Sequence, residues 1–376
     1  MTTAAPAGAG RFPPMDMGGR LQRARAAVAE AGCDALLVTN LANVRYLTGF
    51  SGSAALLLVG PDQLVLATDG RYGVQAGEQL AAAGVVASLA IGSHAAQRDA
   101  VVAAVEGTVR LGLEAASVSW ARQRQLDSEW FPGVTLVPTE GLVEALRRVK
   151  DGGEIARMAE AARLADEALA RVRPRVLAGT TEAEVALALD VEMRRLGADG
   201  SAFETIVAAG PNGARPHARP TARPIATGEL VVVDFGATVD GYRSDMTRTL
   251  CVGRPASATL LRMLDVVASS QRAGVAAVAA GRPAAEVDGA CRDVIAEAGW
   301  ADAFVHGTGH GVGLDIHEAP ALAATSGDTL AAGHVVTVEP GVYLPAHGGV
   351  RIEDTLVVTD DGCLPLTHAP KEPLVS

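Results

Sequence analysis

The first half of the chain alternates short apolar runs with amphipathic stretches. Apolar residues recur at helical spacing over residues 20–31, and Gly32 ends that pattern, so we expect a helix there. Continuous apolar runs predict buried strands at 35–38, 54–59 and 64–67. Strand-like and helical patterns alternate up to about residue 138, which indicates an α/β domain with a mixed sheet.

The alternation ends at a charged stretch, residues 147–154, which we take as a domain boundary. Residues 1–17 are rich in Ala, Gly and Pro and lack the charged start and apolar block of a signal peptide, so we expect a disordered lead-in. The predicted division is therefore a lead-in at 1–17, an N-terminal α/β domain at 18–148 and a second domain at 149–376.

The second half begins with helical periodicity and then becomes rich in strands and turns. Helices are expected at 153–173, 181–196, 257–280 and 284–298. Thr181 and Glu184 have the spacing of a capping box at the start of the second of these helices. The mixture of elements is typical of an α+β domain.

The net charge and the spacing of the cysteines exclude some partners and indicate a cellular location. The net charge of -11 argues against nucleic acid or an anionic membrane as the main partner. The apolar stretches fall short of the roughly 20 residues that a membrane-spanning helix needs. The four cysteines are far apart and none forms a Cys-x-x-Cys pair, so we expect reduced thiols and a cytoplasmic location.

Two aspartates of the second half belong to one predicted hairpin. Residues 240–241, Asp-Gly, are a typical two-residue turn, and that turn would place Asp234 opposite Thr247. Asp245 then lies on the same face as Asp234, roughly 7–8 Å away along the diagonal of the hairpin. The two carboxylates could share a cation, or Asp234 could cap a turn while Asp245 pairs with a neighbouring arginine.

Histidines and further acids follow in turn-rich or strand-end settings. His306, His310 and His317 fall within a glycine-rich stretch, where a ligand or proton-transfer role is more common than for a lone histidine. Glu339 follows an apolar strand, and Glu353 lies within a run, residues 349–359, that we expect to form one strand. Oxygen-rich ligation with one imidazole favours manganese, cobalt or iron over a thiolate zinc site, and four carboxylates suit two ions better than one.

In order, Asp234, Asp245, His310, Glu339 and Glu353 resemble the five metal ligands of the pita-bread metallopeptidases, which include methionine aminopeptidase, aminopeptidase P and prolidase. The motifs Val-Asp-Phe-Gly-Ala, Ser-Asp-Met-Thr-Arg-Thr, Gly-His-Gly-Val-Gly, Val-Glu-Pro-Gly-Val-Tyr and Arg-Ile-Glu-Asp carry this resemblance.

The first half is similar to the N-terminal domain of the Xaa-Pro branch through residues 43–53 and 68–72. The resemblance implies a creatinase-like α/β N-terminal domain followed by an α+β pita-bread catalytic domain. Methionine aminopeptidases generally lack such an N-terminal domain, and creatinase lacks the metal ligands.

The resemblance also assigns roles to residues. It implies two divalent ions, with manganese the expected metal and cobalt, iron or zinc the alternatives. Asp245 and Glu353 would bridge the ions, Asp234 would complete one, and His310 with Glu339 the other. The catalytic side chains would be His217, His306, His317, Glu339 and Arg351. Many relatives have a second histidine after the one that matches His217, whereas this chain has Ala218.

The implied activity is hydrolysis of the peptide bond that precedes proline, through a water bridging the two metals. We expect a Xaa-Pro aminopeptidase that acts on short proline-containing peptides and forms a homodimer. The alternatives are a Xaa-Pro dipeptidase (prolidase) and a non-catalytic binding module on the same fold. Arg71 could hold a carbonyl or terminal carboxylate of the substrate, or simply form a surface ion pair with Asp69.

Overall fold

The computed structural model describes residues 11–375, so most of the predicted lead-in at 1–17 lies outside the described residues. The chain divides into two compact units between Arg147 and Arg148. In the described part of the chain, none of the helices combines the length and the apolar character needed to cross a membrane.

The first unit is built on one mixed six-stranded sheet with the strand order β4-β3-β2-β1-β5-β6. The strands are β1 (Ala35–Val38), β2 (Ala55–Val59), β3 (Leu64–Thr68), β4 (Ser88–Ile91), β5 (Arg110–Glu114) and β6 (Thr135–Thr139). Strand β2 is antiparallel to both of its neighbours, whereas the other pairs are parallel. The mixed sheet agrees with the alternating pattern of the sequence.

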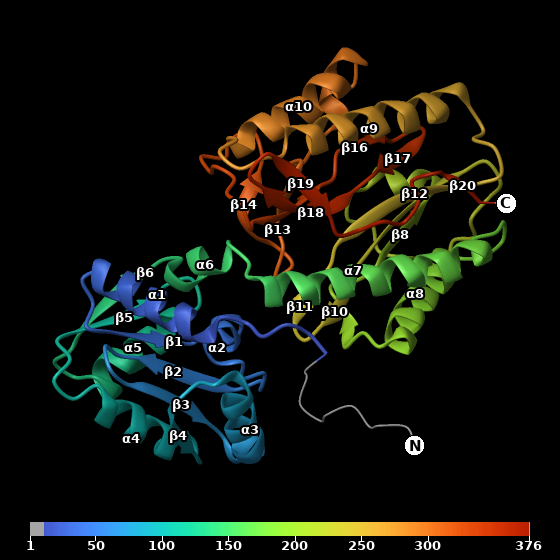
Figure 1. Cartoon of the computed structure of the whole chain (residues 1–376). Helices are drawn as coiled ribbons and strands as arrows, with labels where there is room; N and C mark the ends of the chain where they lie inside the picture. Colours follow the sequence, from blue (N-terminus) through green and yellow to red (C-terminus); the bar gives the residue numbers. More distant parts are fainter. Residues whose placement is uncertain (1–10, 376) are drawn as a thin grey trace, which may run out of the picture. The chain divides into compact units, whose positions relative to one another are not determined.

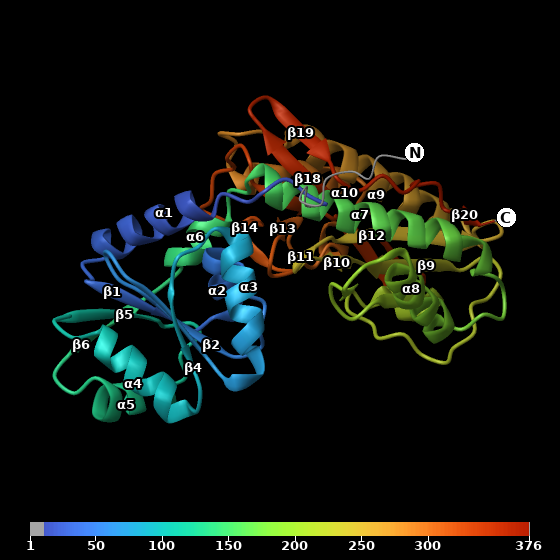
Figure 2. The same ribbon diagram turned by 60° about the horizontal axis from the view of Figure 1, so that its bottom comes forward.

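Helices cover both faces of this sheet. They are α1 (Met17–Glu30), α2 (Leu41–Thr48), α3 (Gly73–Ala83), α4 (His94–Ala104), α5 (Trp120–Gln125) and α6 (Leu142–Arg147). Helices α1, α2 and α6 pack together on one face, and α4 and α5 lie on the other (Figure 2). The central strand β1 is fully buried between the two layers because every one of its residues is apolar.

A buried carboxylate organises the ends of the central strands of this unit. Glu114, the last residue of β5, accepts hydrogen bonds from the backbone N–H groups of Thr39 (2.6 Å) and Asn40 (2.7 Å). Its other oxygen accepts from the side-chain amide of Asn43 (2.7 Å), which also donates to Glu144. These donors fix the start of α2, where Asn40 caps the helix.

The second unit contains two helix pairs and several curved sheets. The helices are α7 (Gly152–Val172), α8 (Glu182–Leu196), α9 (Ala258–Ala277) and α10 (Ala284–Glu297). Helices α9 and α10 pack together on one side of the sheets, and α7 and α8 pack together on the other (Figure 1). Thr181 and Glu184 form the predicted capping box of α8.

The strands of the second unit form two principal sheets. The first has the order β20-β12-β9-β8 and the second β14-β13-β15-β18-β19; smaller sheets are β11-β10-β7 and β16-β17. The strands are β7 (Gly200–Ser201), β8 (Ile206–Ala209), β9 (Leu230–Phe235), β10 (Ala237–Val239), β11 (Tyr242–Arg243), β12 (Met246–Val252), β13 (Gly309–Gly311), β14 (Glu318–Leu322), β15 (Val335–Val338), β16 (Gly341–Leu344), β17 (Gly348–Arg351), β18 (Asp354–Thr359), β19 (Gly362–Pro365) and β20 (Leu374–Val375).

The predicted hairpin is present with the predicted register. Asp240 and Gly241 both have positive φ angles, 47° and 74°, as a two-residue turn between twisted strands requires. Across the hairpin, Asp234 lies opposite Thr247. A region that we expected as one continuous strand from residue 349 to 359 is instead two strands in different sheets, β17 and β18. Glu353 lies in the short break where the chain passes from one sheet to the other.

Candidate metal centre

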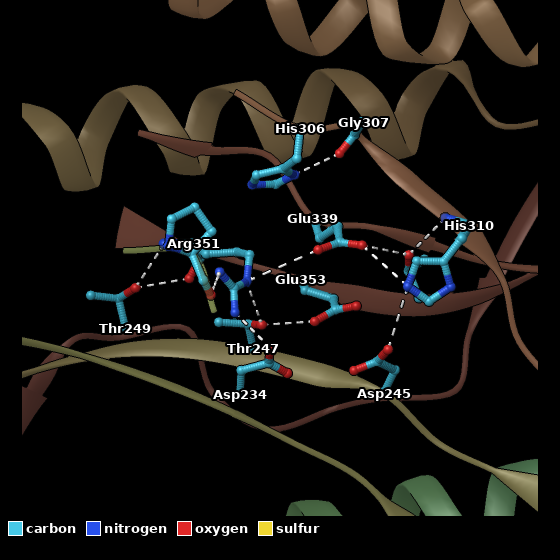
Figure 3. Close-up of polar contacts among 12 residues, drawn as sticks. Asp234, Asp245, Thr247, Thr249, His306, Gly307, His310, Glu339, Arg351 and Glu353 are labelled. Carbon is cyan, nitrogen blue, oxygen red and sulfur yellow. Dashed lines mark hydrogen bonds and ion pairs between the residues drawn. The ribbon is translucent and has the colours of Figure 1, made fainter. Parts of the chain in front are cut away.

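The acids and histidines singled out in the sequence meet at one cavity of the second unit, of about 510 Å³. Asp234 lies near the end of β9, and Asp245 immediately precedes its partner strand β12. His310 lies on β13, Glu339 directly follows β15, and Glu353 lies between β17 and β18. Figure 3 shows their side chains converging from these separate strands.

The ligand atoms are close enough for a shared cation. The His310 Nε2 atom is 3.6 Å from Asp245 Oδ2 and 3.3 Å from Glu339 Oε1. One ligand atom each of Asp245, His310 and Glu353 lies within 4.8 Å of the others. Only one of the three is an imidazole, so the set offers mainly hard oxygen donors.

Two buried carboxylate oxygens of this cluster have no hydrogen-bond donor within the part of the chain that the structure describes. Asp234 Oδ1 and Glu353 Oε1 are buried and accept no hydrogen bond from any described residue. Burial, together with the nearby negative charges, raises the pKa of Asp245 and of Glu353 well above the usual range. Buried carboxylates that lack donors are costly unless a cation balances them, so these residues fit a divalent metal.

Glu339 has a different electrostatic setting from the other acids. Burial alone would raise its pKa, but the hydrogen bond and positive charge of His310, with the charge of Arg351, outweigh burial and lower the pKa of Glu339 to about 2. In the same way, burial would lower the pKa of His310, but Glu339 raises it. Without metal, Glu339 is therefore ionised at neutral pH.

Arg351 lies deep in the site and not at its surface. Its guanidinium donates to Asp234 Oδ2 (2.5 Å), to the Tyr343 hydroxyl (2.8 Å) and to Thr247 Oγ1 (3.0 Å). Burial raises the pKa of Asp234, and the adjacent Arg351 opposes that rise. The pairing of Asp245 with Arg243 or Arg248, the alternative left open above, does not occur. Arg248 pairs with Asp354, and Arg243 donates to the Ala202 carbonyl (2.8 Å).

The predicted pocket histidines occupy three different positions around the cavity. The Nδ1 atom of His306 is 2.7 Å from the Gly307 carbonyl and its Nε2 atom is 2.8 Å from the Tyr343 hydroxyl. Burial lowers the pKa of His306, so its ring is neutral near pH 7. The ring of His317 packs edge-on against that of His310, with 4.3 Å between centroids. His217 lies on an exposed turn that lines the cavity.

Some side chains that shape the site were not singled out from the sequence. Tyr343 links His306 to Arg351 through its hydroxyl, and Thr247 donates to Glu353 Oε2 (2.8 Å). Both residues lie inside motifs that carry the resemblance, so those motifs were a signal that could have identified them.

Backbone segments around the site approach each other too closely for side chains. A Cβ atom at Gly309 would lie 2.0 Å from the carbonyl oxygen of Thr337, and one at Gly349 would lie 1.9 Å from that of Gly213. Glycine is therefore required at both positions.

Arg71 of the first unit forms the surface pair that we considered as an alternative to substrate binding. Its guanidinium donates to both carboxylate oxygens of Asp69, at 2.9 and 2.8 Å. The side chain of Arg71 remains exposed.

Comparison with known proteins places this site in a family. The model of metallopeptidase family M24 matches residues 156–360, more than half of the chain and the whole of the acid and histidine cluster. The chain belongs to metallopeptidase family M24. Residues 20–149 match the Creatinase/Prolidase N-terminal domain. The predicted fold class, a creatinase-like domain followed by a pita-bread catalytic domain, is confirmed.

Individual M24 relatives cover nearly the whole chain. An uncharacterized peptidase of Bacillus subtilis is 40% identical over 356 residues, which are 95% of this chain and 99% of that protein. The structure of a Xaa-Pro dipeptidase from Bacillus anthracis has a TM-score of 0.91 and 38% identity, and covers 96% of this chain and 100% of its own. An X-Pro aminopeptidase from Thermotoga maritima has a TM-score of 0.85 and 32% identity, with 93% and 99% covered.

The similar proteins include both Xaa-Pro dipeptidases and an X-Pro aminopeptidase, but the dipeptidases are more numerous among them. A Xaa-Pro dipeptidase of Pyrococcus furiosus is 39% identical over 62% of this chain and 67% of its own length. The names of the relatives support the dipeptidase alternative better than the aminopeptidase that we expected from the sequence.

Proposed function

We propose that the protein is a Xaa-Pro dipeptidase in which Asp234, Asp245, His310, Glu339 and Glu353 hold two divalent metal ions. The observation that carries this proposal is the pair of buried carboxylate oxygens, on Asp234 and Glu353, that have no donor among the described residues. Two divalent ions would balance the charge of four carboxylates. The predominance of oxygen ligands favours manganese, with cobalt, iron and zinc as the alternatives to be compared.

Bound divalent ions would supply a water ionised near neutral pH and would polarise the scissile carbonyl. The residues of the chain supply the remaining functions. Glu339, whose carboxylate faces His310 across the cavity, would hold a metal and could accept the proton of the attacking water. His217 and His317 border the cavity and can donate hydrogen bonds to the oxygen that becomes negative as the carbonyl is attacked.

Arg351 and His306 hold the acids and the wall of the cavity in place. Arg351 fixes one oxygen of Asp234, so that only the other oxygen remains for a metal. Proline has no backbone N–H, so a peptidase that relies on that donor cannot cleave before proline. Selectivity for Xaa-Pro would therefore come from the shape of the cavity and from protonation of the proline nitrogen as it leaves.

A dipeptide differs from a longer peptide by a carboxylate next to the proline ring. Two arginines line the cavity, and Arg351 is already engaged with Asp234. Arg219 at the rim is 82% exposed and makes an ion pair of 3.2 Å with Glu204, whose side chain is 63% exposed. Such an exposed pair contributes little to stability, so it is free to exchange for a substrate carboxylate. We assign carboxylate recognition to Arg219.

The decisive experiment compares Ala-Pro, Ala-Pro-amide and Ala-Pro-Ala with protein that has been stripped of metal and reloaded with manganese, cobalt, iron or zinc. We expect Ala-Pro to have the highest kcat/KM and the stripped protein to be inactive. Preferential cleavage of Ala-Pro-Ala would make the protein an aminopeptidase. If the protein binds these peptides but hydrolyses none of them with any of the four metals, it is the non-catalytic binding module.

A matched pair of variants tests the role of Arg219. Arg219→Gln should raise KM for Ala-Pro on the order of tenfold, the scale of a lost charged contact, and leave Ala-Pro-amide unchanged. Arg215→Gln changes an exposed arginine of the same loop that does not line the cavity, and it should affect neither substrate.

Homodimer formation, a cytoplasmic location and the domain division at residue 149 stay predictions from the sequence. Sedimentation of the metal-loaded protein, cell fractionation and limited proteolysis would test them in turn.

A further inference from the structure

The segment at residues 304–308 carries His306 and leads into the strand of His310, yet it has no helical or strand hydrogen bonding of its own. Two side chains of helix α10 hold it instead. Asp288, which is fully buried, accepts hydrogen bonds from the backbone N–H (3.0 Å) and the hydroxyl (2.9 Å) of Thr308. The other carboxylate oxygen of Asp288 accepts from Arg292 Nε (2.6 Å), one helical turn away.

Arg292 continues these contacts along the segment. Its Nη1 atom donates to the Phe304 carbonyl (3.1 Å), and its Nη2 atom donates to the His306 carbonyl. The guanidinium also lies over the Phe304 ring, 4.4 Å from the centroid. The Phe304 ring in turn packs edge-on against the His306 ring, with 5.1 Å between centroids. The pair therefore fixes both the backbone and the ring orientation of His306.

The same segment reaches the metal-site acids through the backbone. The carbonyl of Thr308 accepts a hydrogen bond from the backbone N–H of Glu339 (2.7 Å). The His306 ring reaches Arg351 through Tyr343, and Arg351 holds Asp234. Neither Asp288 nor Arg292 is among the residues that line the cavity, so neither is placed to touch a substrate.

We propose that Asp288 and Arg292 are positioning residues, which set the orientation of His306 and the backbone position of Glu339 for catalysis. This inference rests on the proposed function. A buried ion pair is not by itself a strong source of stability, because the desolvation of both charges offsets their attraction. The hydrogen bonds that Asp288 and Arg292 make to the segment are directional, by contrast. They fix one conformation of a segment that lacks regular structure.

A matched control lies next to the same helix. Arg282 and Glu286 form an ion pair with the same four-residue spacing as Asp288 and Arg292, at 3.0 Å, but both of its side chains are about half exposed, 50% and 55%. Arg282→Gln removes an arginine and an ion pair of the same spacing without touching the segment at 304–308.

The experiment uses the full chain with Asp288→Asn, Arg292→Gln, Arg292→Lys, the double variant Asp288→Asn/Arg292→Gln and the control Arg282→Gln. Hydrogen–deuterium exchange of the metal-free proteins reports on the segment without reference to activity. We expect faster exchange at residues 304–308 in the four test variants and no change in the control. Arg292→Lys keeps the charge beside Asp288 but cannot reach two carbonyls, so it should restore little.

With metal and Ala-Pro added, we expect kcat to fall 10–100-fold in the test variants, the usual scale for residues that orient a metal site. KM should change much less, and the double variant should be no worse than the more impaired single variant, because the two residues act as one unit. A purely structural role would lower the melting temperature and the active fraction but leave kcat per active site unchanged.

Faster exchange at 304–308 with an unchanged kcat would overturn the positioning role, and so would unchanged exchange. If Asp288→Asn does not fold, Arg292→Lys and Arg292→Gln still decide the question. If the wild-type protein cleaves no Xaa-Pro peptide, the proposed function fails, whereas the exchange data still show whether these residues hold the segment.

Discussion

Two buried glutamates, one in each unit, show what separates a structural acid from a metal ligand. Glu114 is 6% exposed and Glu353 is 1% exposed. Burial is the largest influence on both and raises the pKa of each. By burial and by the direction of the pKa shift alone, the two residues look alike.

They differ in the donors that surround them. Both oxygens of Glu114 accept hydrogen bonds, and three of the donors belong to Thr39 and Asn40 at the start of α2. Among residues 11–375, Glu353 has a donor on one oxygen only, the Thr247 hydroxyl. A buried carboxylate with a full set of donors needs nothing further, whereas the charge of one without them is costly unless a cation balances it.

The largest expected effect is on catalysis. Glu353→Gln should lose metal and reduce kcat/KM by at least on the order of 10³, because it removes a ligand that also balances charge. Glu114→Gln should keep metal and kcat. Metal analysis and Ala-Pro hydrolysis with both variants measure the contrast, and equal loss in the two would remove the distinction drawn above.

A second change separates metal binding from catalysis inside the cavity. His217 borders the cavity but belongs to none of the close carboxylate contacts. His217→Ala should retain metal and lose on the order of 10²–10⁴ in rate, as expected for an acid, base or oxyanion donor. A parallel fall in metal content would show that His217 is a ligand and that the ligand set is misassigned.

The third expected effect is on the stability of the metal-free protein, and it has opposite signs at the two glutamates. Glu114→Gln leaves backbone N–H groups without a good acceptor, so the free energy of unfolding should fall by about 1–3 kcal/mol. Glu353→Gln relieves repulsion among clustered acids, so the free energy of unfolding of this variant should rise on the order of 1 kcal/mol.

Urea unfolding followed by tryptophan fluorescence can resolve the two units. Trp120 and Trp130 report on the first unit and Trp300 on the second, so Trp300→Phe isolates the first transition. Destabilisation by both substitutions would mean that the metal-site acids have donors of their own.

The last expected effect concerns a buried histidine that stays neutral in the folded protein. Burial, with the charges of Arg148 and Lys150, lowers the pKa of His334 to about 4, and its Nδ1 atom accepts a hydrogen bond from Ala331 N–H. The unfolded chain binds a proton near pH 6.5 and the folded chain does not, so stability falls as the pH drops below that value.

Between pH 7.5 and 5.5 this single group should lower the unfolding free energy by about 1.4 kcal/mol. Urea unfolding of the chelator-treated protein at both pH values measures it. The His334→Gln side chain cannot titrate. Over the same pH range, the unfolding free energy of this variant should therefore fall by about 1.4 kcal/mol less than that of the wild type. An identical pH dependence in the two proteins would contradict the assignment.

Much of the fold follows from local patterns. The strand at 35–38 and the capping box of Thr181 and Glu184 depend on neighbouring residues, and the hairpin at 240–241 sets the register of Asp234 against Thr247. The family motifs indicated the acids and histidines that the structure brings to one cavity.

Contacts between distant residues could not be predicted in the same way. The break of the strand at Glu353 depends on two different partner strands, β16 and β15. The Asp288–Arg292 pair has the same sequence spacing as the exposed pair of Arg282 and Glu286, so no local pattern distinguishes a residue that holds the site from one on the surface. Only the fold decides which pair faces the segment of His306.

The close backbone approaches at Gly309 and Gly349 have a consequence for how such an enzyme can diversify. No side chain fits at Gly309, which lines the cavity, or at Gly349, two residues before Arg351, so neither position can accept a substitution. The rim, at residues 203–206 and 216–220, includes the exposed side chains of Glu204 and Arg219, whose substitution is not restricted by packing. New substrate preferences should therefore arise by substitutions at the rim, while the chemistry beneath is inherited unaltered.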